Sequence, residues 1–172
     1  ESIRDFDHFL RENPRQDPYH WQRGISYYYA AQYAKGAAQF DRHKAVNPQD
    51  VENSVWHYLC KSKMEGADKA RESLIEIERD RRPWAMMVYQ LFQQKVTPEQ
   101  VIQHAEQTSP RSLRKDSLFY AHLYVGLYYE SLKQDVKALD HIRLAVKKYP
   151  SPHYMGDVAR VHLQLREQAD KD

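Results

Sequence analysis

The sequence predicts an all-α fold, a right-handed superhelix of antiparallel helix pairs that ends in a capping helix. Five glycines among 172 residues are few for a chain rich in β-strands. Small residues and prolines also recur with a 34-residue period. Gly24 and Gly126 both hold the eighth place of the unit, where a glycine lets two helices cross closely. Pro48 and Pro150 both hold the thirty-second place, where a proline ends the second helix.

The chain begins with half a unit, residues 1–16. The apolar residues between Ile3 and Leu10 have a helical spacing, and Pro14 ends that helix. Because Pro14 lies one period before Pro48, the helix resembles the second half of an earlier unit. We therefore expect more protein upstream of this segment.

The first complete unit is 17–50. Asp17 followed by Pro18 predicts the start of its first helix, because an N-cap side chain and a proline both suit a helix N-terminus. His43 stands where a small alanine is usual, so we expect either a displaced helix or a histidine that is hydrogen-bonded at an interface. Asp50 is the predicted N-cap of the following helix.

The next two units, 51–84 and 85–118, depart further from the pattern. Both lack the glycine at the eighth place, and 85–118 is the degenerate one. Its second helix is expected to be short before the break at Ser109-Pro110. That helix still has a clear start, because Thr97 and Gln100 have the spacing of a capping box.

The last unit, 119–152, carries the most complete pattern. A final helix over 153–168, opened by Ser151-Pro152, is expected to cap the array, since a repeat array must cover its last apolar face. The pattern residues of this unit are Gly126, Tyr129, Ala138, Ala145 and Pro150. The sequence therefore predicts one domain over 1–172.

These positions resemble the tetratricopeptide repeat (TPR). Between Trp21 and Leu163 the chain also resembles the NlpI-like TPR proteins, which are bacterial envelope lipoproteins. That resemblance implies an adaptor in the cell envelope or periplasm, because members of the family act as dimers that hold an envelope protease together with a cell-wall hydrolase. The segments that carry it are Val55 to Leu59, Ala70 to Leu74, Trp84 to Phe92, Phe119 to Tyr129, Ala138 and Ala145-Val146.

In a TPR the first helices of successive units line a concave groove. The register places mostly apolar and aromatic residues there, which favours binding of a hydrophobic or aromatic peptide segment or a partner helix. The lysine and asparagine of a carboxylate clamp are absent from the fifth and ninth places. In the alternative interpretation the groove is filled by a second copy of the chain. The predicted groove residues are Trp21, Ile25, Tyr28, Tyr29, Glu52, Val55, Leu59, Met86, Tyr89, Gln93, Tyr120, Leu123 and Leu127.

Only one pair of residues suggests chemistry. His57 and Cys60 share a helical face, and His43 or His122 would be the third ligand of a metal site. No second ligand pair accompanies them. As a nucleophile, Cys60 would lie in the middle of a helix, away from a helix N-terminus that could lower its pKa. We therefore expect no enzymatic activity, no metal and no cofactor.

Composition limits the partners. A net charge of +2 and a pI near 8.6 do not imply a nucleic-acid partner. A single cysteine excludes an internal disulfide framework. No run approaches the length of a membrane span, so we expect no direct membrane insertion. The chain starts at Glu1 without a methionine, which is compatible with a removed signal or anchor.

Overall fold

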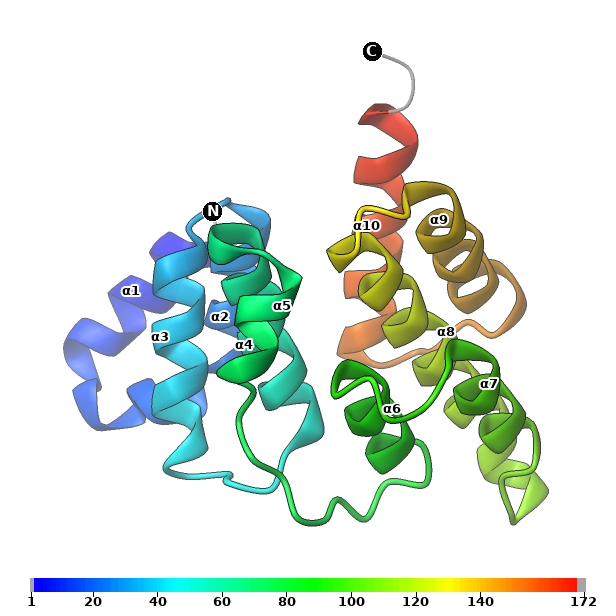
Figure 1. Ribbon diagram of the computed structural model, residues 1–172. Coiled ribbons are helices and arrows are strands. Elements are labelled where there is room, and N and C mark those ends of the chain that lie inside the picture. Colours follow the sequence, from blue (N-terminus) through cyan, green and yellow to red (C-terminus); the bar gives the residue numbers. More distant parts are fainter. Residues whose placement is uncertain (1, 170–172) are drawn as a thin grey trace. The chain divides into compact units, whose positions relative to one another are not determined.

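The computed structural model describes residues 2–169, and every regular element in that range is a helix (Figure 1). The predicted all-α class is therefore confirmed. The chain forms two compact units, Glu1–Asp80 and Arg81–Asp172. The continuous superhelix and the single repeat domain stay predictions.

The first unit consists of short helices that pack on their neighbours in the sequence. They are α1 (Ser2–Glu12), the 3-10 helix η1 (Pro14–Tyr19), α2 (Trp21–Tyr29), α3 (Tyr33–Lys44), α4 (Val51–Glu65) and α5 (Ala67–Glu72). α2 packs on α3, α3 on α4 and α4 on α5, while α1 covers α2. Phe40, Trp56 and Tyr58 are among its largest fully buried side chains, so this unit has a core of its own.

The second unit repeats this arrangement around one long helix. It contains α6 (Ala85–Phe92), α7 (Pro98–Glu106), the 3-10 helix η2 (Arg111–Leu113), α8 (Arg114–Ser131), α9 (Asp135–Arg143), the π-helix η3 (Leu144–Lys148) and α10 (Tyr154–Ala169). α8 packs on α6, α7 and α9, and α10 packs on α9 and η3. Trp84, Phe119 and Tyr124 are buried in its core.

The two pattern glycines lie where helices cross. A Cβ atom on Gly24 of α2 would stand 2.6 Å from the ring of Phe40 on α3. A Cβ atom on Gly126 of α8 would stand 2.7 Å from Cδ1 of Ile142 on α9 and 3.0 Å from the carbonyl oxygen of Ala138. Such contacts are too short for a Cβ atom, so both crossings need a glycine, as the pattern predicts.

Three helix pairs are joined by the same turn. Its left-handed residues are Ala31, Gln94 and Lys133, with φ angles of 55°, 60° and 59°. In each turn, the residue that follows the left-handed residue donates its backbone N–H to the carbonyl five positions before it. This is the hydrogen bond of the Schellman motif, which ends many α-helices. These bonds join Gln32 to Tyr27, Lys95 to Gln90 and Gln134 to Tyr129. The sequence does not predict these turns, because none of the three left-handed residues is a glycine.

The predicted helix start at Asp17-Pro18 is wrong. Asp17 lies inside η1 together with Pro18, and α2 follows His20, whose side chain makes no capping bond. The Asp17 carboxylate instead pairs with Arg23 at 2.9 Å and with Arg42 at 2.5 Å. It therefore ties η1 to α2 and α3 rather than capping a helix.

Other local predictions are confirmed. His43 is buried, and its Nδ1 donates to a backbone carbonyl of η1 at 2.8 Å. The Asp50 side chain caps α4 by accepting the N–H of Glu52 at 3.0 Å. Thr97 and Gln100 make both bonds of the capping box at the start of α7.

Several helix lengths differ from the expectation. The short second helix belongs to unit 51–84, because α5 has six residues whereas α7 has nine. After α5 the chain continues as a segment without regular secondary structure, in which Ile75 and Ile77 are buried. α8 begins at Arg114, five residues before 119, since the break at Ser109-Pro110 leads through η2 directly into the helix.

Candidate functional site

The predicted groove residues fall into two classes. Seven are buried and belong to the core: Ile25, Tyr28, Val55, Leu59, Tyr89, Leu123 and Leu127. Six are partly exposed: Trp21, Tyr29 and Glu52 in the first unit, and Met86, Gln93 and Tyr120 in the second. Only the second class presents surface to a partner in this conformation. Sequence reasoning did not separate the two, because a helical apolar stripe looks the same whether a partner or the chain itself covers it.

In the first unit the exposed edge of Tyr29 belongs to a fixed aromatic cluster. Tyr28 packs edge-on against Tyr29 and against Trp56, with ring centroids 5.3 Å apart in both pairs. Tyr29 also lies 6.2 Å from the Trp56 ring. Because Trp56 is 1% exposed, the cluster is anchored in the core and Tyr29 is held in place before any partner arrives.

A similar stack lies in the second unit. The Tyr120 ring is stacked on the Trp84 ring, with centroids 4.2 Å apart and an interplanar angle of 12°. The guanidinium carbon of Arg82 lies 4.8 Å from the Trp84 ring centroid. Trp84 is 2% exposed, so its buried ring supports the ring of Tyr120. Tyr120 is the partly exposed member of the stacked pair.

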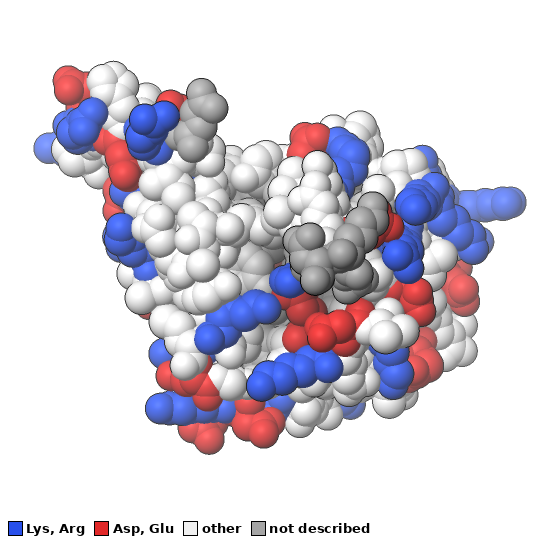
Figure 2. All heavy atoms as spheres, turned by 90° about the horizontal axis from the view of Figure 1, so that it is seen from above, with Lys and Arg blue, Asp and Glu red and all other residues white. Residues whose placement is uncertain are grey.

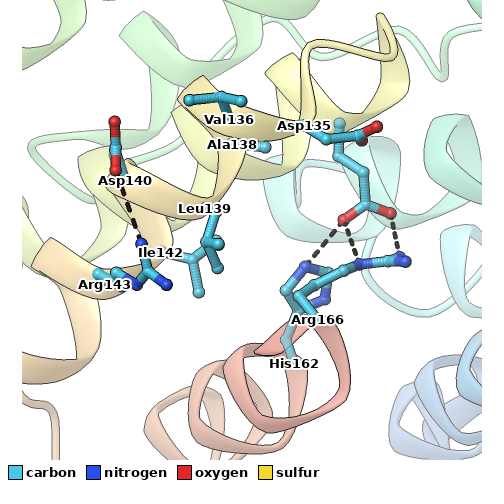
Figure 3. Close-up of a pocket in the computed structure, with 10 residues that line it drawn as sticks. Asp135, Val136, Ala138, Leu139, Asp140, Ile142, Arg143, His162 and Arg166 are labelled. Atoms are coloured by element: carbon cyan, nitrogen blue, oxygen red, sulfur yellow. Dashed lines mark hydrogen bonds and ion pairs between the residues drawn. The ribbon is translucent and has the colours of Figure 1, made fainter. Parts of the chain in front are cut away.

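A pocket that sequence reasoning missed lies between α9 and α10. It encloses about 280 Å³, with Leu139 and Ile142 of α9 on one side and His162 and Arg166 of α10 on the other (Figure 3). Its remaining lining residues are Glu130, Asp135, Val136, Ala138, Asp140 and Arg143. Because the lining combines aliphatic and charged side chains, the pocket suits a ligand that has both apolar and charged groups.

A buried ion cluster closes one end of this pocket. The Glu130 side chain is only 5% exposed, and one of its oxygens lies 2.8 Å from Nε2 of His162. Arg166 binds both carboxylate oxygens from the next turn of α10. The only sequence signal was the pair His162 and Arg166 four residues apart, and nothing in the sequence named Glu130 as their partner. The cluster attaches α10 to α8.

Charges of both signs lie side by side on one face of the molecule. The face shown in Figure 2 has Lys and Arg side chains beside Asp and Glu side chains, without one large patch of a single sign. At the rim of the α9–α10 pocket, Nε of Arg143 lies 3.1 Å from Glu167 and its Nη1 lies 3.9 Å from Asp140. This pattern agrees with the net charge of +2.

His57 and Cys60 are buried in α4. The Cys60 side chain is 0% exposed, and burial raises the pKa of its thiol to about 12, so the thiol is protonated at neutral pH. Nε2 of His57 lies 3.4 Å from Oδ1 of Asp41. Burial lowers the pKa of His57, against the opposing effect of Asp41. A buried neutral thiol is not a nucleophile, and its position at the crossing with Gly36 indicates a packing role.

No protein-family model matches the sequence, and no curated protein matches it. Within residues 2–169, no three His, Cys, Asp or Glu side chains are grouped in a way that could hold a metal ion. No helix in that range is long and apolar enough to cross a membrane. The fold defines an all-helical protein built from neighbouring helix pairs.

Proposed function

We propose that the chain is a non-enzymatic scaffold of the TPR type that binds a segment of another protein. The repeated glycine crossing is the observation that supports this most directly. Gly24 and Gly126 lie three periods of 34 residues apart, and each meets the side chain sixteen positions further along, Phe40 or Ile142. Stacked helix pairs with such a period form extended surfaces for protein binding.

The proposed setting is the bacterial envelope, with the chain as an adaptor. This part rests on the resemblance to the NlpI-like proteins alone. The resemblance is carried by residues on helices that the repeat pattern already explains, such as Gly126 and Ala138. The binding role and the cellular setting are therefore separate proposals, and each needs its own test.

Each unit has its own proposed contact residues, which are its partly exposed aromatics: Trp21 and Tyr29 in the first unit, and Tyr120 in the second. Tyr29 and Tyr120 rest on the buried indoles of Trp56 and Trp84, so their rings are already ordered. Ordered aromatic rings add contact area at a low cost in conformational entropy. The ligand is accordingly a peptide segment with aromatic or aliphatic side chains.

A displayed library of random peptides, selected on the full chain, tests this proposal. Selected peptides should be rich in aromatic and aliphatic residues, and calorimetry should show that Tyr29→Ala or Tyr120→Ala weakens their binding by about tenfold or more. Tyr19→Ala is the control, because Tyr19 is 56% exposed on η1 and lies outside the proposed surface. Equal affinities for all three variants would contradict the proposed surface.

Self-association is the second candidate, and α10 supplies the observation that favours it. Tyr154, Val161 and Leu165 are 42%, 47% and 45% exposed, and their spacing puts them on one face of the helix. An exposed apolar stripe is uncommon on a terminal repeat helix, whose outer face is usually polar. Light scattering should then report a dimer that becomes a monomer in Val161→Glu, and a monomeric parent chain would remove this candidate.

A further inference from the structure

Two histidines from adjacent helices meet at a cleft in the second unit. Nδ1 of His122 on α8 and Nδ1 of His141 on α9 are 3.0 Å apart. Within the described part of the chain, neither imidazole makes a further hydrogen bond. Both line a cleft of about 250 Å³ whose opposite wall is α7, with Glu99 and Glu106 among its residues.

The separation of the two nitrogens suits a shared metal ion. Two nitrogens that are each 2.0–2.1 Å from one ion and 3.0 Å from each other subtend about 91–97° at that ion. This is the angle between neighbouring ligands in square-planar and octahedral coordination, whereas a tetrahedral ion needs the nitrogens about 3.3 Å apart.

We propose that His122 and His141 bind one divalent late first-row transition-metal ion, Cu²⁺ in preference to Zn²⁺, with solvent in the remaining coordination positions. Imidazole is a good ligand for both ions, and Cu²⁺ stands highest in the order of affinities for nitrogen ligands. With two protein ligands the site differs from a structural zinc site, which has four. It is also separate from His57 and Cys60, which lie in the other unit.

The surroundings hold the two rings in position. The Tyr149 ring is stacked on His122, with centroids 5.4 Å apart and an interplanar angle of 10°. Tyr149 directly follows the π-helix η3, and single-turn π-helices are frequent at functional sites. The Tyr129 ring lies 5.7 Å from that of His141. Glu99 adds a negative charge that acts on His141, which also favours a bound cation.

Copper titration of the metal-free full chain tests the site. We expect one Cu²⁺ per chain, an electron paramagnetic resonance spectrum with coupling to two nitrogens, and a higher melting temperature. His141→Gln should weaken binding roughly 10–100-fold or more, because loss of a ligand costs at least as much as loss of an outer-shell partner. His153→Gln is the control, since His153 is exposed and lies outside the cleft.

Two results would overturn the proposal. One is a spectrum that shows fewer than two coordinated nitrogens in the parent chain. The other is unchanged copper affinity in His141→Gln. If that variant is not fully folded by circular dichroism, the parent chain still decides the question, because substoichiometric Cu²⁺ must broaden the ring proton signals of His122 and His141 before those of the other histidines.

Discussion

Gly126 shows how one residue can fix the distance between two helices. The nearest atoms to a Cβ there are Cδ1 and Cγ1 of Ile142 and the carbonyl oxygen of Ala138. The isoleucine side chain can turn away, but the backbone carbonyl cannot without moving α9. A larger residue must therefore push the two helices apart and break the contacts of the last pair.

Gly126→Leu should accordingly destabilise the protein by about 3 kcal/mol, since an overpacked crossing has no room to relax. Chemical denaturation followed by circular dichroism measures this. Val136→Leu on the same helix pair is the control, because Val136 is 78% exposed and should change stability by less than about 0.5 kcal/mol. An unchanged midpoint for Gly126→Leu would refute the crossing.

His57 gives a prediction for pH. Because burial lowers its pKa below the ordinary 6.5, His57 is neutral in the folded chain while the unfolded chain takes up a proton as the pH falls through 6.5. Burial of the neutral His57 ring therefore costs no stability above pH 6.5, and the free energy of unfolding falls progressively as the pH drops below that value. His57→Leu should therefore lose less stability between pH 7.5 and 5.5 than the parent, as measured by urea unfolding.

The control for that experiment is His8→Leu, because His8 is exposed on α1 and its Nδ1 faces Arg11 at 3.0 Å. This variant removes an exposed histidine and leaves His57 in place. Identical slopes for the parent and His57→Leu would mean that His57 is not the group responsible.

Cys60 gives a chemical test of burial. With a pKa of about 12 and no exposed surface, its thiol should react with iodoacetamide at pH 8 only when the chain opens. Mass spectrometry should show labelling in concentrated urea and almost none in buffer over the same time. Rapid labelling of the folded chain would place Cys60 at the surface and contradict its packing against Gly36.

At the scale of elements, the repeated turn is the feature that stands out. Ala31, Gln94 and Lys133 adopt left-handed backbone angles that non-glycine residues seldom take. The turn persists because the C-cap hydrogen bonds and the packing of the following helix hold it. The strain is therefore offset by contacts beyond the turn itself.

Ala31→Gly should raise the free energy of unfolding by about 0.5–1 kcal/mol, because glycine takes a left-handed angle without steric cost. Thermal or urea unfolding measures the gain. Ala38→Gly is the matched control: Ala38 is exposed in the middle of α3, where glycine should cost about 1 kcal/mol. A loss of stability in both variants would argue against the left-handed turn.

At the scale of the whole molecule, the main feature is that the chain divides after Asp80 into two compact units. Residues 73–84 form no α-helix between α5 and α6, although Ile75 and Ile77 are buried. Each unit contains its own set of fully buried aromatic side chains. A unit with its own core is expected to fold alone.

We therefore expect the fragment 81–172 to be helical by itself and to unfold cooperatively on heating. Circular dichroism of the isolated fragment measures both properties. The fragment 1–80 is the companion sample, since it has a separate core around Trp56. A fragment 81–172 without a sharp transition would show that the second unit needs the first in order to fold.

The sequence by itself determined the local features. Capping at Asp50 and at Thr97, and the close crossing at Gly126, follow from residues a few positions apart or from a fixed period. Helix starts and spacings obey rules within about one turn, which is why one sequence carries enough information for them.

Only the tertiary structure decided which side chains meet. Asp17 became an ion-pair partner of Arg23 instead of an N-cap, and seven of the predicted groove residues turned out to be core. Glu130 pairs with Arg166, which lies 36 positions further along the chain, and His122 contacts His141, which lies 19 positions further along. Such contacts depend on how helices pack, and a helical pattern records which face is apolar but not what covers it.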